Sequence, residues 1–173
     1  TRTILTGGDM QREEKTLTFT ATDSHRLAMR KSNIDTEVES NNVVVPGKSL
    51  NELNKILDDT EETVEINVTS NQILFRTKHL SFLSRLLDGN YPETKRLIPE
   101  GSKTRIRVNT KDLLGTIDRA SLLAREERNN VVRLTTHGDS IVEISSNSPE
   151  VGNVNEEIVV ESIEGEELKI SFS

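Results

Sequence analysis

The sequence predicts an α+β protein in which short strands are interrupted by two helices. Three observations support this class. Apolar residues alternate in several short stretches, two stretches carry an apolar stripe at helical spacing, and the elements around both helices follow a similar order. Hydrophobic residues make up 32% of the 173 residues and aromatic residues 3%, so we expect a core built from Leu, Ile and Val.

Alternating and β-branched runs predict the strands. They cover residues 17–21, 27–30, 43–45, 63–68, 73–76, 80–87, 106–108, 131–135, 141–145, 157–160 and 168–172. Pro46 and Gly47 form a turn signal after the third run, and Ser70 and Asn71 fit a tight turn within a meander.

Two apolar stripes predict the helices. The first consists of Leu50, Leu53, Ile56 and Leu57, and the second of Leu113, Leu114, Ile117, Ala120 and Ala124. Either Asn109 or Thr110 can cap the start of the second helix. The pattern V-x-x-K-x-L precedes or opens both helices, at residues 45–50 and 108–113, which indicates an internal repeat. The boundary between repeats is expected within residues 89–102, where prolines and glycines gather.

The negative charge is concentrated near the C-terminal end. Of 29 acids and 22 bases, nine acids and Lys169 alone lie in residues 138–173, which leaves 20 acids and 21 bases elsewhere. A net charge of -7 therefore does not exclude a nucleic-acid partner. Cysteine is absent, which excludes disulfides and suits a cytoplasmic protein. No apolar run approaches the ~20 residues that span a membrane. The first residues contain neither a signal peptide nor a starting Met, so we expect the natural protein to begin upstream of Thr1.

Signals for catalysis are weak. Asp23 and His25 could form a carboxylate–histidine pair around Ser24, but no nucleophile is aimed at either, so a turn is the favoured interpretation. The acidic run formed by Asp58, Asp59, Glu61 and Glu62 could bind a cation, although a solvated loop is favoured. We expect no metal and no cofactor.

Basic residues lie off the apolar stripes of both predicted helices, where they could face a phosphate backbone or simply solvent. They are Lys48, Lys55, Lys111, Arg119 and Arg125. Leu122 lies opposite the buried stripe of the second helix, which indicates either a partner surface or a frayed helix end that turns it into the core.

Six motifs, in order, resemble the bacterial sliding clamp, which is the beta subunit of the replicative DNA polymerase, in its low-GC Gram-positive form. They are ILTG at 4–7, ATDSHRLA at 21–28, VPGKSL at 45–50, SRLLDGNYP at 84–92, RASLLARE at 119–126 and SSNSPE at 145–150. The resemblance implies a DNA-clamp fold: a ring of two chains whose repeated β/α units place helices on the inner face and antiparallel sheets on the outer face. Residues 1–100 would be most of the middle domain without its first helix, and residues 101–173 the N-terminal half of the third domain.

The resemblance also implies a function and its sites. The chain would be a non-enzymatic processivity factor that encircles duplex DNA without sequence preference, forms a homodimer and uses no cofactor. Short linear peptides of the polymerase, the clamp loader and repair proteins would bind a pocket that includes Leu5, Thr22, Ser24, His25, Arg26, Leu27, Pro92, Arg96 and Leu97. Leu122 and Leu123 would lie at the subunit interface, and the five bases would face the DNA.

Alternatives remain beside this interpretation. Leu5 and Leu27 could be ordinary core residues, and His25 could only cap a turn. After residues 5–7 the family usually continues with an apolar strand, whereas residues 8–12 intervene here, so the register of the first hairpin and the placing of Leu5 stay open. The alternative functions are a clamp-like protein-binding adaptor that never encircles DNA and an enzyme fragment that uses Asp23 and His25.

Overall fold

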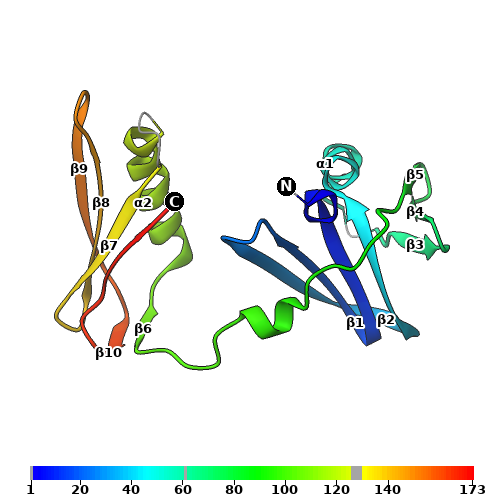
Figure 1. The fold of residues 1–173 in the computed structure, drawn as a ribbon, viewed down its shortest axis with the longest axis horizontal. Helices are drawn as coiled ribbons and strands as arrows, with labels where there is room; N and C mark the ends of the chain where they lie inside the picture. Colours follow the sequence, from blue (N-terminus) through cyan, green and yellow to red (C-terminus); the bar gives the residue numbers. More distant parts are fainter. Residues whose placement is uncertain (1, 61, 126–129) are drawn as a thin grey trace. The chain divides into compact units, whose positions relative to one another are not determined.

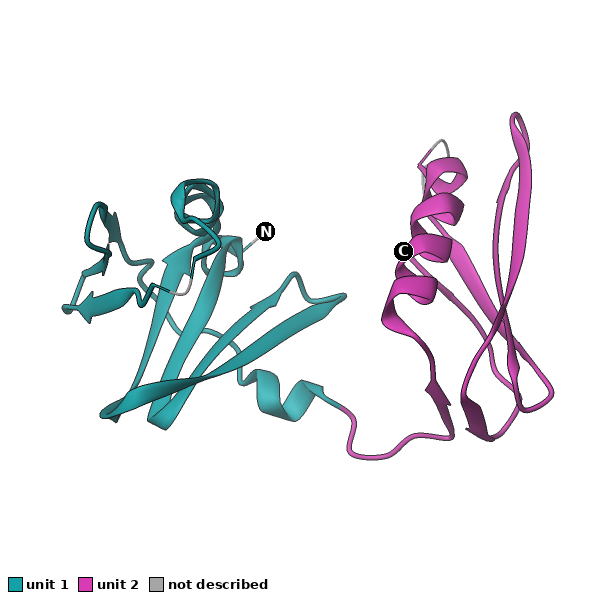
Figure 2. Ribbon diagram, turned by 180° about the vertical axis from the view of Figure 1, so that it is seen from behind, with its two compact units in different colours: residues 1–98 teal, residues 99–173 magenta. Residues whose placement is uncertain are grey.

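The structure is a computed structural model that describes residues 2–60, 62–125 and 130–173 (Figure 1). Glu61 of the acidic run and Glu126 of the fifth motif lie outside the described residues. The chain divides into two compact units, residues 1–98 and residues 99–173 (Figure 2). Each unit is described by itself, as unit 1 and unit 2.

The described residues of unit 1 form five strands, one α-helix and two short 3-10 helices. In chain order they are η1 (Thr3–Thr6), β1 (Gly7–Thr22), β2 (Leu27–Pro46), α1 (Gly47–Ile56), β3 (Glu65–Val68), β4 (Gln72–Arg76), β5 (Ser81–Arg85) and η2 (Thr94–Leu97). Strands β1 and β2 form an antiparallel hairpin, and β3, β4 and β5 form an antiparallel meander. A bridge between Val44 and Leu87 connects the hairpin with the chain beyond the meander.

The first hairpin is longer than the sequence predicts. The register that the sequence left open is that of a continuous strand, because β1 runs through residues 8–12 and pairs with the end of β2. The strand accommodates this segment because Met10, fully buried, supplies an apolar side chain to the core, while Asp9 lies among the buried polar residues. The pairing shifts register on both sides of Glu14, whose positive φ of 51° marks a sharp local change of direction.

The core of unit 1 lies between the hairpin, the meander and α1. It contains Met10, Leu17, Val45, Leu53, Ile73 and Phe75. The prediction that Ile56 belongs to the buried stripe is wrong, since its side chain is 42% exposed. The helix ends at Ile56, and Leu57 leaves it in an extended conformation and packs against the core instead.

In unit 2, the part of the chain that the structure describes forms six strands and one α-helix. In chain order they are β6 (Thr104–Arg107), α2 (Thr110–Ala124), β7 (Val132–His137), β8 (Ile141–Ser148), β9 (Gly152–Val159), β10 (Ser162–Gly165) and β11 (Lys169–Phe172). Four strands form an antiparallel sheet in the order β11-β7-β8-β9, and β10 pairs with β6. Helix α2 lies along one face of the four-stranded sheet (Figure 2). Strand β10 was not predicted, because its four residues include only one large apolar side chain, Ile163.

Small residues let α2 approach this sheet closely. Ala120 and Ala124 pack with Val132, Val142 and Ile144 in the core of unit 2. The predicted burial of Leu114 is wrong, since its side chain is 58% exposed. Thr116 occupies the core-facing position instead, and its hydroxyl donates a hydrogen bond to the backbone oxygen of Asp112 at 2.8 Å, which makes burial of this polar group tolerable.

The same order of elements, strand–helix–three strands, occurs in both units. It is β2-α1-β3-β4-β5 in unit 1 and β6-α2-β7-β8-β9 in unit 2. The predicted internal repeat and the α+β class are therefore confirmed. The predicted helix cap is also confirmed, and it is Asn109, whose side-chain oxygen accepts hydrogen bonds from the N–H groups of Lys111 and Asp112. Among the described residues, no helix has the length and apolar character needed to span a membrane.

Candidate functional site

The Tyr91 hydroxyl brings the two ends of β1 together. It accepts a hydrogen bond from the backbone N–H of Thr22 at 3.0 Å and donates one to the carbonyl oxygen of Gly7 at 3.3 Å. A straight strand of 16 residues would separate its ends by about 50 Å, so β1 must double back within unit 1. The motif segments around residues 4–7, 21–28 and 84–92 consequently meet at one place, although they are distant in sequence.

The turn between β1 and β2 is held by Asp23. Its carboxylate accepts hydrogen bonds from the backbone N–H groups of His25 and Arg26, each at 3.0 Å, and pairs with the Arg26 guanidinium at 2.9 Å. The two backbone hydrogen bonds, followed by the contact with Arg26, lower the pKa of the Asp23 carboxyl to about 2. Asp23 and His25 thus meet through the backbone of His25, which agrees with the turn interpretation and gives no catalytic pair.

This turn presents polar groups beside apolar ones. Ser24, His25 and Arg26 are exposed, whereas Thr22 is buried and its hydroxyl donates to the Arg26 carbonyl oxygen at 2.7 Å. Ser24 has a φ of 78°, a left-handed conformation that turns the chain sharply.

Three of the four apolar members of the predicted pocket are half-buried. They are Leu5 on η1, Leu27 at the start of β2 and Pro92 directly after Tyr91. None of them belongs to the set of fully buried core residues, so the ordinary-core interpretation of Leu5 and Leu27 finds no support in unit 1. Half-buried aliphatic side chains next to exposed polar ones are the composition expected of a small ligand site.

Arg96 and Leu97 lie on η2, which begins two residues after Pro92. Leu97 is 57% exposed, and Arg96 pairs with Glu93 at 2.8 Å. Pro92 and Arg96 line a hollow of about 320 Å³, here called the Asp9 hollow, together with Asp9, Gln11, Asn42, Tyr91, Glu93, Thr94 and Lys95. Sequence reasoning found neither Tyr91 nor Asp9, because nothing in their local sequence indicates the distant groups they meet.

The five predicted DNA-facing bases are exposed and differ in their partners. Lys48 and Lys111 are each the second residue of their helix, and the described residues supply no ion pair to either. Lys55 pairs with Glu52 on the same helix at 2.8 Å. Arg125 follows the last residue of α2.

Arg119 differs from the other bases because its charge is already offset. Its Nε donates to both carboxylate oxygens of Glu156 on β9 at 2.9 Å, and its guanidinium also contacts the Thr116 hydroxyl at 3.4 Å. This pair ties α2 to the sheet of unit 2 and leaves Arg119 less available to a phosphate than the sequence suggests.

The two leucines near the end of α2 have different environments. Leu122 is 63% exposed, and Leu123 is half-buried. Helix α2 continues regularly to Ala124, so the alternative that a frayed end turns Leu122 into the core is wrong. Leu122 remains an apolar side chain directed away from the core of unit 2.

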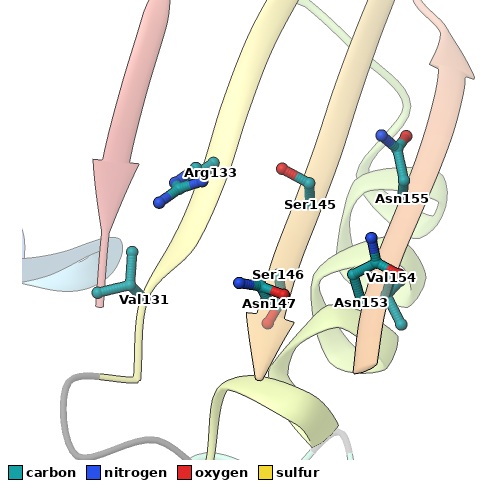
Figure 3. Close-up of a pocket in the computed structure, with 8 residues that line it drawn as sticks. All are labelled: Val131, Arg133, Ser145, Ser146, Asn147, Asn153, Val154 and Asn155. Carbon is teal, nitrogen blue, oxygen red and sulfur yellow. The ribbon is translucent and has the colours of Figure 1, made fainter. Parts of the chain in front are cut away.

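A polar hollow of about 400 Å³ lies on unit 2 beside the strands β7, β8 and β9 (Figure 3). Its lining includes Arg133, Ser145, Asn147, Asn153 and Asn155. Ser145 and Asn147 belong to the sixth motif, but the sequence assigned no site to any of these residues. No group of three or more metal-ligating side chains occurs in residues 2–60, 62–125 and 130–173.

Two family models match the chain in succession. The model described as DNA polymerase III beta subunit, central domain, matches residues 1–93, and the model described as DNA polymerase III beta subunit, C-terminal domain, matches residues 95–173. The chain belongs to the DNA polymerase III beta subunit family. The α+β architecture described above is accordingly the clamp fold of this family.

Individual relatives agree with this membership. The chain is 62% identical to the beta sliding clamp of Bacillus subtilis over 174 residues, covering all of this chain and 46% of the relative. A crystal structure of the Bacillus subtilis sliding clamp superimposes with a TM-score of 0.90 at 61% identity, again over 100% of this chain and 46% of that one. A Pseudomonas aeruginosa sliding clamp bound to griselimycin superimposes with a TM-score of 0.83 at 29% identity, over 98% of this chain and 45% of the other. The chain thus spans about half the length of these relatives.

Proposed function

We propose that this chain is part of a sliding clamp, a non-enzymatic processivity factor that encloses duplex DNA and docks its partners through short peptides. The observation that carries the proposal is the succession of the central-domain and C-terminal-domain matches over residues 1–93 and 95–173. In this proposal, residues 1–100 supply most of the middle domain and residues 101–173 the N-terminal half of the third domain. The ring is a homodimer of longer chains and acts in the cytoplasm.

The placement of Lys48 and Lys111 supports a phosphate-facing role for both helices. Each lysine lies in the first turn of its helix, where the partial positive charge of the helix disfavours a cation. In α1 no side chain caps the first N–H groups, so an anion can approach these groups and Lys48 together. In α2 Asn109 already caps the N–H groups of Lys111 and Asp112, so there the ammonium group of Lys111 alone would meet the anion. The phosphate backbone of DNA is such an anion, and contacts of this kind carry no sequence information.

The remaining bases contribute unequally to this proposed surface. Lys55 and Arg125 lie on the same helices and add to its positive charge. Arg119 contributes least, because Glu156 already neutralises it. Weak contacts suffice, since a closed ring holds the duplex by topology rather than by affinity.

The neighbourhood of Tyr91 supports the proposed peptide pocket. Leu5, Leu27 and Pro92 offer apolar walls, while Ser24, His25 and Arg26 offer polar groups that set the orientation of a bound peptide. Arg96 and Leu97 extend the pocket along η2. The Pseudomonas clamp is bound to griselimycin, and we propose this compound as a second probe of the pocket in this chain. Leu122 and Leu123 are proposed to pack against a second subunit.

The test of enclosure compares circular with linear DNA. A clamp protein containing this chain is loaded onto nicked circular duplexes, and its retention is measured before and after the circle is cut. We expect retention on circles and rapid loss from free ends. Equal loss from both forms would instead support the adaptor that binds proteins without enclosing DNA.

The test of the peptide pocket uses this 173-residue chain. A synthetic peptide carrying the clamp-binding motif is titrated into labelled protein and followed by NMR. We expect weak binding with shifts at residues 22–27 and 92–97. Shifts confined to other residues would contradict the assignment of the pocket.

A further inference from the structure

The Asp9 hollow contains a buried carboxylate whose charge is not balanced. Asp9 is only 6% exposed, and its Oδ1 atom has no hydrogen-bond partner. Desolvation by burial raises the pKa of this carboxyl to about 6, although a side-chain hydrogen bond with Asn42 opposes the effect. The Oδ1 atom thus lacks the donor that a buried carboxylate oxygen normally has.

The bases that line the Asp9 hollow are already paired with other acids. Lys95 lies 3.6 Å from the carboxylate of Glu13, and Arg96 lies 2.8 Å from that of Glu93. Their positive charges are offset at these contacts, so neither one neutralises Asp9. Asp9 itself is among the residues that line the hollow.

The Asp9 hollow adjoins the proposed peptide pocket. Pro92 and Arg96 belong to both, and Tyr91 lines the hollow while its hydroxyl binds Thr22 of the pocket. A peptide anchored against Leu5, Leu27 and Pro92 can therefore place a neighbouring side chain in the hollow without leaving the surface of unit 1.

We propose that the Asp9 hollow is a second subsite of the peptide pocket and receives a lysine or arginine side chain that flanks the apolar anchor of the partner peptide. The inference rests on the proposed function, because it presupposes that a peptide binds at residues 22–27 and 92–97. An ammonium or guanidinium group supplies the missing donors and the opposite charge, and partial burial strengthens this interaction. An acidic flanking residue would meet the carboxylate of Asp9 and be disfavoured.

The experiment is a cycle of protein and peptide variants on the 173-residue chain. All synthetic peptides carry the same clamp-binding motif. Each peptide has one substituted position in the residues that flank the motif, on either its N-terminal or its C-terminal side. One set carries Lys at that position and the other set carries Gln. Their affinities are measured by fluorescence anisotropy for the unsubstituted chain, for Asp9→Asn and for the matched control Asp59→Asn. Asp9→Asn keeps the shape of the side chain, whereas Asp59→Asn removes an equal charge from an exposed loop.

At one flanking position, the Lys peptide should bind the unsubstituted chain and the Asp59→Asn variant about tenfold more tightly than the Gln peptide. This preference should disappear in Asp9→Asn, while the affinity of the Gln peptide should change little. A Lys preference that persists unchanged in Asp9→Asn would show only general attraction to an acidic chain and would overturn the subsite. Absence of any Lys preference while both peptides still bind would overturn the subsite but leave the peptide pocket intact. If neither peptide binds the unsubstituted chain, the proposed pocket fails and the subsite fails with it.

Discussion

The hydroxyl of Tyr91 lies 3.0 Å from the backbone nitrogen of Thr22, a residue 69 positions earlier in the chain. The same hydroxyl binds the carbonyl oxygen of Gly7 at 3.3 Å, so one phenol closes the bent strand β1 at both ends. The turn that carries His25 and Arg26 is thereby fixed relative to η1 and Pro92. The geometry of the proposed peptide pocket consequently depends on a residue that need not touch the peptide.

Replacing Tyr91 by Phe removes both hydrogen bonds while keeping the ring. We expect a loss of about 1–3 kcal/mol in the free energy of unfolding of unit 1, because the Thr22 N–H and the Gly7 carbonyl lose their partner. Urea denaturation measures the loss, and amide hydrogen exchange at Thr22 should become faster. Amides of β7 and β8 in unit 2 serve as internal controls. Unchanged exchange at Thr22 would contradict this role of the hydroxyl.

Asp9 should make the stability of unit 1 depend on pH. Its pKa is raised from 3.8 to about 6 in the folded chain, so its ionisation opposes folding. The stability that this group contributes is fully present below pH 3.8 and is lost as pH rises through about 6. Asp9→Asn should therefore be more stable than the unsubstituted chain by about 1–2 kcal/mol at pH 7.5, with the difference shrinking toward pH 4.

Chemical denaturation at several pH values checks this dependence. The Asp59→Asn variant is the matched control, since it removes a carboxylate from an exposed loop. An Asp9→Asn variant that is no more stable than the unsubstituted chain at pH 7.5 would mean that the buried carboxylate has a partner after all.

The cap of α2 offers a stability test in unit 2. Asn109→Ala removes the side-chain oxygen that accepts hydrogen bonds from Lys111 and Asp112, at 3.0 and 3.3 Å. We expect a loss of about 1 kcal/mol in the unfolding free energy of unit 2. Asn54→Ala, an exposed substitution inside α1, is the control and should not reduce stability. Equal effects of both substitutions would argue against the cap.

The two lysines at the helix starts predict a salt dependence of DNA binding. Lys48→Gln combined with Lys111→Gln should weaken binding of duplex DNA and reduce the slope of log affinity against log salt by about 2, since each phosphate contact contributes about 0.9. Fluorescence anisotropy with duplexes of unrelated sequence measures both quantities. Lys169→Gln on β11 is the control for the loss of one base. If the double variant retains the original slope, these lysines do not contact phosphates.

Local patterns in the sequence were sufficient to predict most elements of the fold. Both helices, the meander around Ser70 and Asn71 and the repeated order of elements follow from periodicity and turn residues over short ranges. The two wrong stripe positions, Ile56 and Leu114, share a cause. Periodicity gives only the mean direction of an apolar face. In α1 the helix ends at Ile56, so Leu57 reaches the core instead. In α2 the hydrogen bond of the Thr116 hydroxyl allows Thr116 to be buried while Leu114 is exposed.

The candidate site was only partly accessible from the sequence. The resemblance supplied the segments around Leu5, Thr22 and Pro92, whereas the atoms that hold them together could not be predicted. Tyr91 acts on residues 69 and 84 positions away, and Arg119 meets Glu156 at a separation of 37. Such contacts depend on the complete packing of a unit, and no local spacing encodes them.

The central claim is that α1 and α2 face enclosed DNA, and proximity cleavage tests it directly. Because the 173 residues contain no cysteine, Lys48→Cys and Lys111→Cys can each carry an iron-based cleavage reagent in a clamp otherwise free of cysteine. Leu83→Cys on the exposed face of β5 is the matched control. On loaded circular duplex, the account predicts sequence-independent strand cleavage from positions 48 and 111 and little from position 83. Cleavage from position 83 alone, or equal cleavage from all three, would contradict it.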